Sequence, residues 1–172
     1  MIAFTSSHDI NFTAIDFETA NNNRYSACAL GLVQVKSGTI VSKKTFLIRP
    51  PERYFKFSYI HGLTWEHVKD MPTFAELWPF IKPELLTGDF LVAHNAPFDR
   101  SVLTRTCEYY GIGLPELRFE CTVKLARNVL GIQPARLPNV CEVLGITLNK
   151  HHDPLADAVA CAKIMLHAAK LE

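Results

Sequence analysis

The sequence lacks several features that would assign it to a specialised class of protein. No window approaches the ~18 uninterrupted apolar residues of a membrane-spanning helix, and the first eleven residues hold no positive charge followed by an apolar stretch. No Ser-rich, Gly-rich or single-charge segment and no internal repeat divides the chain. We therefore expect residues 1–172 to form a single domain without membrane contact, with a core at about residues 10–170.

The chain also has almost no net charge and no paired cysteine motif. Its 18 Lys and Arg against 17 Asp and Glu leave a charge of +1. This balance argues against a broad basic face that holds a long duplex, whereas a short nucleic acid is compatible with it. The five cysteines contain no C-x-x-C pair, so neither zinc nor a redox dithiol is indicated. Reduced, buried thiols of this kind are typical of a cytoplasmic protein.

What the sequence does contain is the pattern of an α/β domain with a mixed sheet. Three strands are expected at residues 12–17, 26–35 and 39–48, as a meander with a turn at 36–38. Strand and helix then alternate, with strands at 90–93 and 118–121 and helices at 73–86, 96–110, 123–130, 137–144 and 154–169. Pro79 and Pro83 are expected to shorten or kink the first of these helices.

Carboxylates interrupt two of these apolar patterns. Asp16 and Glu18 stand two residues apart on a strand, so their side chains project from the same face. An ordinary exposed strand face would also explain them. Asp99 falls in the first turn of a helix whose expected N-cap is Asn95. A carboxylate at that position is often only a partner of the helix dipole.

A fourth carboxylate follows near the start of the last helix. Asp153 is expected to cap this helix and Pro154 to occupy its first position, so Asp157, about one turn further in, is not needed for capping. His152 precedes the helix and is free to point toward whatever Asp157 faces. Four clustered carboxylates are stable only with hard cations, and oxygen ligands favour Mg²⁺ or Mn²⁺. Two such ions are the arrangement that supports phosphodiester cleavage.

Three motifs carry these residues in a fixed order along the chain. They are Asp16-Phe17-Glu18-Thr19, His94-Asn95-Ala96-Pro97-Phe98-Asp99, and His152 followed five residues later by Asp157. In order and separation they resemble the three motifs of the DEDDh (DnaQ-like) 3′-5′ exonucleases. That family includes polymerase proofreading subunits, RNase T and oligoribonuclease, and the resemblance spans about residues 10–170.

The resemblance implies a ribonuclease-H-like fold, a mixed five-stranded sheet with three antiparallel and then two parallel strands, flanked by helices. It implies two Mg²⁺ ions, for which Mn²⁺ would substitute, held by Asp16, Glu18, Asp99 and Asp157. His152 would be the general base, since it has the family's spacing to Asp157. His151 is then expected to be a solvent-exposed neighbour.

Four further residues resemble positions near the 3′-terminal nucleotide in this family: Thr19, Ala20, His61 and Asn95. His61 begins a recurrent family loop, His61-Gly62-Leu63-Thr64, although a histidine that only packs a loop stays an alternative. The chain departs from the family at Cys121-Thr122, where many relatives carry an Asp-Thr pair. It also ends at the last helix, without the polymerase-binding linker and tail of a proofreading subunit, which favours a free-standing nuclease.

The function implied is a metal-dependent 3′-5′ exonuclease that releases nucleoside 5′-monophosphates from single-stranded or frayed DNA or RNA. The choice between DNA and RNA stays open, since no motif fixes a contact to the 2′-hydroxyl. Two other functions stay open as alternatives, a proofreading subunit associated with a DNA polymerase and an inactive nucleic-acid-binding module. A plain α/β domain with surface acids is a third. A homodimer is likewise an open alternative.

Overall fold

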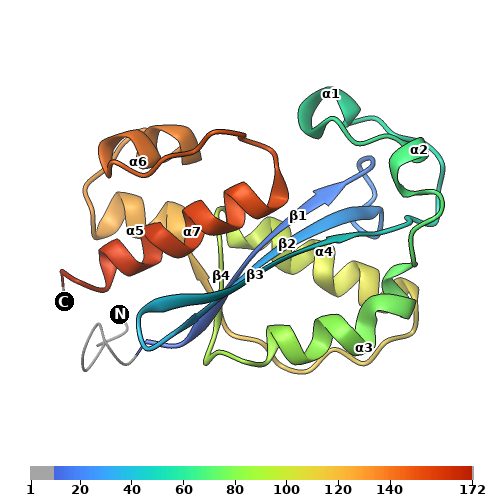
Figure 1. Ribbon diagram of the computed structural model, residues 1–172, viewed down its shortest axis with the longest axis horizontal. Coiled ribbons are helices and arrows are strands. Elements are labelled where there is room, and N and C mark those ends of the chain that lie inside the picture. The colour runs from blue at the N-terminus through green and yellow to red at the C-terminus, as the bar shows by residue number, and fades with distance from the viewer. Residues whose placement is uncertain (1–9, 172) are drawn as a thin grey trace.

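The computed structural model describes residues 10–171, and its centre is one five-stranded sheet in the order β3-β2-β1-β4-β5 (Figure 1). The first three strands pair antiparallel, and β4 and β5 run parallel to β1. The strands are β1 (Phe12–Thr19), β2 (Ala27–Lys36), β3 (Thr39–Leu47), β4 (Leu91–Ala93) and β5 (Phe119–Cys121). The predicted mixed sheet of three antiparallel and two parallel strands is therefore confirmed.

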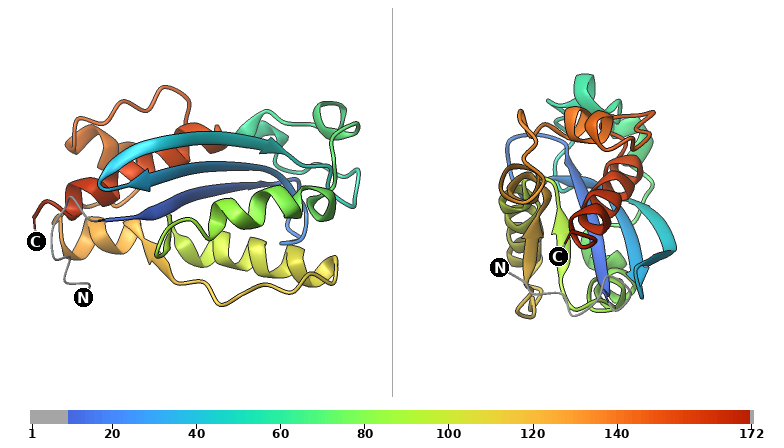
Figure 2. Two further views of the ribbon diagram at one scale, coloured as in Figure 1. Left: turned by 60° about the horizontal axis from the view of Figure 1, so that its bottom comes forward. Right: turned by 90° about the vertical axis from the view of Figure 1, so that its left-hand side faces the viewer.

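Helices cover both faces of this sheet (Figure 2). One face carries α5 (Thr122–Asn128), α6 (Leu137–Val143) and α7 (Pro154–Ala168), and the other carries α3 (Phe74–Leu85) and α4 (Ala96–Tyr109). Two short helices that the sequence pattern did not predict, α1 (Ser58–His61) and α2 (Trp65–Val68), lie between β3 and α3. Among residues 10–171, no helix is long and apolar enough to cross a membrane.

Alternation along β1 builds a core on each face. Phe12 and Ala14 pack on the side of α7, whereas Ile15 and Phe17 pack on the side of α3 and α4. All four side chains are buried. Complete burial of a Phe or Ile side chain contributes about 1.5–3 kcal/mol to the free energy of unfolding. The strand is therefore fixed from both faces, and its polar residues are held in a definite orientation.

The helix starts show which local predictions hold. Asp153 caps α7 as predicted, since its Oδ1 accepts hydrogen bonds from the backbone N–H groups of Leu155 (3.1 Å) and Ala156 (3.0 Å). Asn95 does stand at the N-cap position of α4, but the prediction that its side chain caps the helix is wrong. Its backbone is left-handed (φ 65°, ψ 52°) and the side chain makes no capping hydrogen bond. Capping requires an extended backbone, and asparagine is among the few residues that tolerate the left-handed conformation.

The proline-containing helix α3 keeps nearly its full predicted length. It extends over 12 residues with Pro79 and Pro83 inside it, so the prolines do not shorten it, and the alternative of a kink stays a prediction. A capping box stabilises its start, because the Thr73 N–H donates to Glu76 Oε2 (2.7 Å) and the Glu76 N–H donates to Thr73 Oγ1 (3.4 Å). Buried Phe74, Ile81 and Leu85 then hold the helix against the sheet.

Candidate active site

The carboxyl half of β1 is paired on one side only. β2 pairs along the whole of β1, whereas β4 pairs only with Thr13 and Ala14. Further along, the N–H of Phe17 donates instead to Oδ1 of Asp99, at 2.9 Å. Because β4 ends at Ala93 and α4 begins soon after, the first turn of α4 supplies the partner that a longer strand would have supplied. Asp99 is thereby placed beside Asp16 and Glu18.

A glycine lets the last helix reach the same place. Gly31 lies opposite Asp16 in the β1–β2 pair. A Cβ atom at Gly31 would lie 2.0 Å from the carbonyl oxygen of Pro154, so only a residue without a side chain permits this contact. The first turn of α7 therefore rests directly on the sheet, and it brings Asp157 toward Asp16. The sequence patterns did not identify Gly31, because the close approach joins segments far apart in the chain.

The pKa values of the carboxyl groups reflect their burial and their mutual repulsion. Burial raises the pKa of Asp16 well above its ordinary range, and the negative charges of Asp99, Glu18 and Asp157 raise it further. Burial and the charges of Asp157 and Asp99 raise the pKa of Glu18 to about 8. Burial also raises the pKa of Asp99 to about 7, although the hydrogen bond from the Phe17 N–H acts in the opposite direction. The residues form one cluster of acids.

This cluster has the chemistry of a divalent cation site. Its carboxylates are destabilised in their charged form by burial and by mutual repulsion, and a bound cation removes the effect of both. All the donor atoms of the four acids are oxygens, the ligands that Mg²⁺ and Mn²⁺ prefer. The residues present therefore fit a hard metal ion.

Two adjacent histidines flank Asp157, and one of them differs from expectation. His152 has a left-handed backbone (φ 69°), and its N–H donates to Oδ2 of Asp157 at 3.0 Å. The His151 ring stacks on that of His152, with centroids 3.7 Å apart, and its Nδ1 lies 2.9 Å from the same Oδ2. His151 is exposed, as predicted, but it is also a direct partner of Asp157. Donor atoms of the three residues lie within 4.8 Å of one another, so this group could also hold a metal ion.

The residues predicted near the terminal nucleotide occupy two sides of the cluster. Thr19, Ala20 and His61 gather at the end of β1, where Nε2 of His61 lies 3.2 Å from the Thr19 carbonyl oxygen. Ala20 is fully buried, and its carbonyl accepts hydrogen bonds from the N–H groups of residues 56 and 57. Asn95 lies exposed at the start of α4. Their contacts with a nucleotide stay predictions.

Two cavities share His151, the partner of Asp157, in their linings. One has a volume of 500 Å³ and is lined by residues that include His61, His152 and Lys150. The other has a volume of 840 Å³ and includes Asn95, Arg127 and Arg136 in its lining, together with His151. The sequence analysis did not single out the two arginines.

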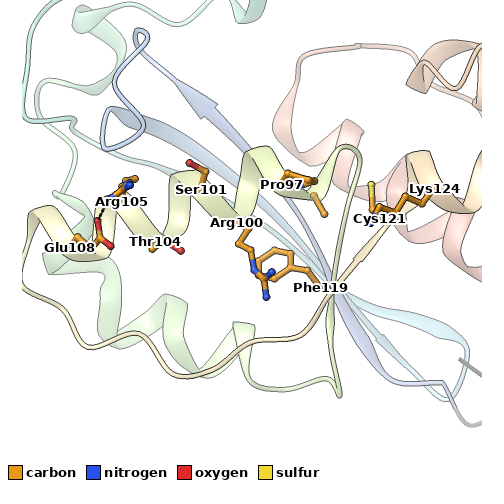
Figure 3. A pocket seen from close by; sticks show the side chains of 10 residues that line it. Pro97, Arg100, Ser101, Thr104, Arg105, Glu108, Phe119, Cys121 and Lys124 are labelled. Atoms are coloured by element: carbon orange, nitrogen blue, oxygen red, sulfur yellow. Dashed lines mark hydrogen bonds and ion pairs between the residues drawn. The ribbon is translucent and has the colours of Figure 1, made fainter. Parts of the chain in front are cut away.

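A third cavity, of 440 Å³, runs along the outer side of α4 (Figure 3). Its basic side chains are largely engaged with neighbours. Arg105 forms an ion pair with Glu108 at 2.7 Å. Arg100 stacks over Phe119, at 5.3 Å from the ring centroid, and donates to a backbone carbonyl.

A mixed sheet with carboxylates from β1, α4 and α7 at one end defines a nuclease domain of the ribonuclease-H-like fold. The family model described as "Exonuclease" (RNase T) matches residues 13–165. The chain belongs to this exonuclease family, and its fold is that of the DEDDh 3′-5′ exonucleases, which depend on divalent metal ions.

Individual relatives agree with this assignment. The chain is 30% identical over 167 residues to a DNA polymerase III of the PolC type from Thermotoga maritima, covering 95% of this chain but 12% of that protein. The chain therefore spans about an eighth of that relative's length. Exonuclease X, solved with 5′ overhanging duplex DNA, is 25% identical with a TM-score of 0.73, covering 91% and 90% of the two chains. The nuclease domain of 3′hExo, a DEDDh family member bound to rAMP, shares the fold at 18% identity, with a TM-score of 0.78 and coverage of 95% and 93%.

Proposed function

We propose that this chain hydrolyses phosphodiester bonds at the 3′ end of single-stranded or frayed DNA or RNA and releases nucleoside 5′-monophosphates. One observation carries the proposal, the convergence of four buried or half-buried carboxylates from three elements beside His152. The four are Asp16, Glu18, Asp99 and Asp157. Like charges are brought together at such a cost to stability only where a cation and its chemistry compensate.

These carboxylates would hold two Mg²⁺ ions, and Mn²⁺ would substitute because all the ligands are oxygens. When bound, such a pair supplies an activated water nucleophile and stabilises the charge on the leaving oxygen. The chain contributes the positions of the ligands: Asp99 is oriented by the Phe17 N–H, and Asp157 by the N–H of His152.

His152 would act as the general base, taking a proton from the attacking water at a ring nitrogen. This role needs the neutral imidazole. Burial and the neighbouring His151 lower the pKa of His152, while Asp157 partly offsets them, so the neutral form is favoured at pH 7. The backbone hydrogen bond to Asp157 holds this residue beside the carboxylates.

The 3′-terminal nucleotide would lie on the side of the 500 Å³ cavity, near Thr19, Ala20 and His61. Burial lowers the pKa of His61, so its ring is neutral at pH 7 and its Nε2 donates to the Thr19 carbonyl while Nδ1 accepts from the Leu63 N–H. The loop is thereby fixed at the end of β1. Asn95 would contact the same substrate from the start of α4.

A second candidate is favoured by the PolC-type relatives, namely a proofreading exonuclease associated with a DNA polymerase. Co-purification with a polymerase and weak activity alone would support this candidate.

The five cysteines are free and buried, which supports a cytoplasmic location.

The test is a digestion of 5′-labelled single-stranded DNA and RNA oligonucleotides with Mg²⁺, Mn²⁺ or EDTA. We expect a ladder that shortens from the 3′ end with either ion and no products with EDTA. The Asp16→Asn variant, purified in parallel, excludes a contaminating nuclease. Immediate release of the labelled 5′ nucleotide would contradict the proposed polarity. Binding without metal-dependent hydrolysis would establish the inactive binding module instead.

A further inference from the structure

The largest of the three cavities described above has an unusual balance of charge. It has a volume of 840 Å³, in the range of sites that hold organic ligands, and lies between the start of α4, α5 and α6. Arg127 and Arg136 line it, whereas none of its lining residues is an Asp or a Glu. At one end are Asn95 and His151, the latter in contact with Asp157. A basic cavity is thus connected to the acidic cluster through His151.

Both arginines are exposed and have no partner within residues 10–171, where neither side chain forms an ion pair or a hydrogen bond. The cavity along α4 differs, because there Arg105 is paired with Glu108 and Arg100 donates to the carbonyl of residue 117. Unpaired guanidinium groups offer several donors each in a planar arrangement that suits phosphate.

The backbone that carries these arginines is held in place relative to the site. Arg127 lies in the last turn of α5 and Arg136 is the N-cap residue of α6. The loop before Arg136 is anchored where Asn139 Nδ2 donates to the Pro134 carbonyl oxygen, at 2.7 Å. Thr122, at the start of α5, bonds through Oγ1 to Nδ1 of His94, at 2.8 Å.

The His94 ring that makes this last link is uncharged near neutral pH. Burial lowers the pKa of His94 to about 4, so its ring stays uncharged. The residue immediately follows β4 and precedes Asn95. It therefore joins the strand that leads into the catalytic helix α4 to the wall that carries Arg127.

We propose that Arg127 and Arg136 bind phosphate groups of the substrate strand on the 5′ side of the scissile bond. The inference rests on the proposed exonuclease function, which places the terminal nucleotide on the side of His61. The strand must then leave the cluster by another route, and the cavity that adjoins at His151 is open, basic and free of acids. Its other walls include Val123, Pro134 and Leu137, apolar surfaces against which sugars and bases pack. The substrate is thus a strand of several nucleotides.

The test uses the double variant Arg127→Gln/Arg136→Gln and a 5′-fluorescein-labelled dT12 oligonucleotide in EDTA, with binding followed by anisotropy over a range of salt concentrations. The slope of log K against log salt is negative, and loss of two phosphate contacts on a single strand should reduce its magnitude by about 1.4. Affinity at 0.1 M salt should fall on the order of tenfold. With Mg²⁺, the ratio of kcat/KM on dT12 to that on the p-nitrophenyl ester of thymidine 5′-monophosphate should fall similarly.

The matched control is Lys36→Gln/Lys43→Gln, which removes the same charge from the β2–β3 hairpin beside the amino half of β1. The control should keep the wild-type slope and ratio. An equal loss in both double variants would overturn the proposal, because it would reflect net charge alone. So would an unchanged slope in the arginine variant, or a fall on the ester as large as that on dT12.

Failure of the proposed exonuclease function can be distinguished from failure of the proposed arginine contacts. A wild-type protein that hydrolyses neither the ester nor dT12 with Mg²⁺ or Mn²⁺ would contradict the exonuclease activity. The anisotropy measurement in EDTA does not depend on hydrolysis, so the role of Arg127 and Arg136 in binding a strand would still be decided by its slope.

Discussion

The two halves of β1 differ in strand pairing and in charge although they form one continuous strand. The amino half, residues 12–15, is fully buried and is paired with β2 along its length and with β4 at Thr13 and Ala14. Its Phe12 ring stacks on Phe90, with centroids 5.6 Å apart. The carboxyl half has only one strand neighbour, and Asp16 and Glu18 are half-buried among other acids.

This difference separates the part of the strand that stabilises the fold from the part that does not. Apolar burial and strand pairing stabilise the amino half. The acids of the carboxyl half destabilise the metal-free protein, because burial and repulsion disfavour their charged forms. Two features create the acidic environment within a few residues of the apolar one: β4 ends early, and Gly31 lets α7 approach the sheet.

Neutral substitutions in the acidic half give the largest expected effect on activity. Nearly all activity should be lost in each of four single variants: Asp16→Asn, Glu18→Gln, Asp99→Asn and Asp157→Asn. Each lowers the charge that holds the metals at nearly constant side-chain volume. The metal-free melting temperature should be unchanged or higher, since repulsion is reduced. Full activity in any two of these variants would remove the basis for a four-carboxylate site.

Truncation in the amino half should produce the opposite pattern. Phe12→Ala should cost about 3–5 kcal/mol of stability, because it leaves a cavity in the core. Denaturant unfolding measures the loss. Activity per folded molecule should be kept, since the carboxylates are untouched. A stable Phe12→Ala protein would show that the two halves do not divide stability and function in this way.

The two histidines beside Asp157 should differ in their effect on the reaction. His152→Ala should lower the rate on the order of 10² to 10⁴, the usual contribution of a positioned base, while metal binding persists. His151→Ala should have the smaller effect, because it removes one of the two hydrogen bonds to Asp157 Oδ2 and leaves the base. Loss of turnover in His151→Ala but not in His152→Ala would show that the base is wrongly assigned.

The pH profile of turnover should report the same residue. The base must be neutral, so activity should rise with pH through the pKa of His152. Burial and His151 lower this pKa, so the acidic limb should lie below the unperturbed value of about 6.5. If the residual activity of His152→Ala kept the same acidic limb, a group other than His152 would be responsible for that limb.

Gly31→Ala should disturb the site from outside the acidic residues. A Cβ atom 2.0 Å from the Pro154 carbonyl oxygen must displace the start of α7, and with it Asp157. We expect a stability loss of about 1–3 kcal/mol and a rate lowered on the order of 10². Gly113→Ala is the matched control, since nothing lies within 4 Å of that position. Equal behaviour of the two variants would contradict the close contact.

The smallest expected effect is on the pH dependence of stability in EDTA. Glu18 and Asp99 have pKa values of about 8 and about 7 in the folded protein, above those of unfolded carboxyl groups. Their protonation stabilises the fold fully at acidic pH, and this contribution is lost as pH rises through the folded values. The melting temperature should therefore fall between about pH 5 and 8, and Glu18→Gln should flatten the fall. A rise over this range in EDTA would contradict the raised pKa values.

Much of this fold could be predicted from the sequence, since long apolar patterns determine the sheet and the main helices. Features that depend on tertiary contact could not. The left-handed backbone at Asn95, the contact of Gly31 with α7, and the bond from His151 to Asp157 leave no local pattern. The helices α1 and α2 have only four residues each, too few for periodicity to detect.

The candidate site, like the fold, could be predicted only in part from the sequence. Motifs placed the four acids on a strand and two helix starts, and the structure brings those elements together. The roles of the acids and of His152 stay predictions. Arg127 and Arg136 could not be found from the sequence, because nine positions separate them along the chain and only the fold places them in one cavity.

Calorimetric titration with Mn²⁺ at pH 7 tests most directly whether the carboxylates at the carboxyl end of β1 bind divalent metal. Run in two buffers that differ in ionisation enthalpy, the titration also counts protons. Since Glu18 and Asp99 have pKa values of about 8 and about 7, Mn²⁺ should bind with release of protons. Both the binding and the release should weaken sharply in Asp99→Asn. Absence of Mn²⁺ binding, or binding that Asp99→Asn leaves unchanged, would contradict the account.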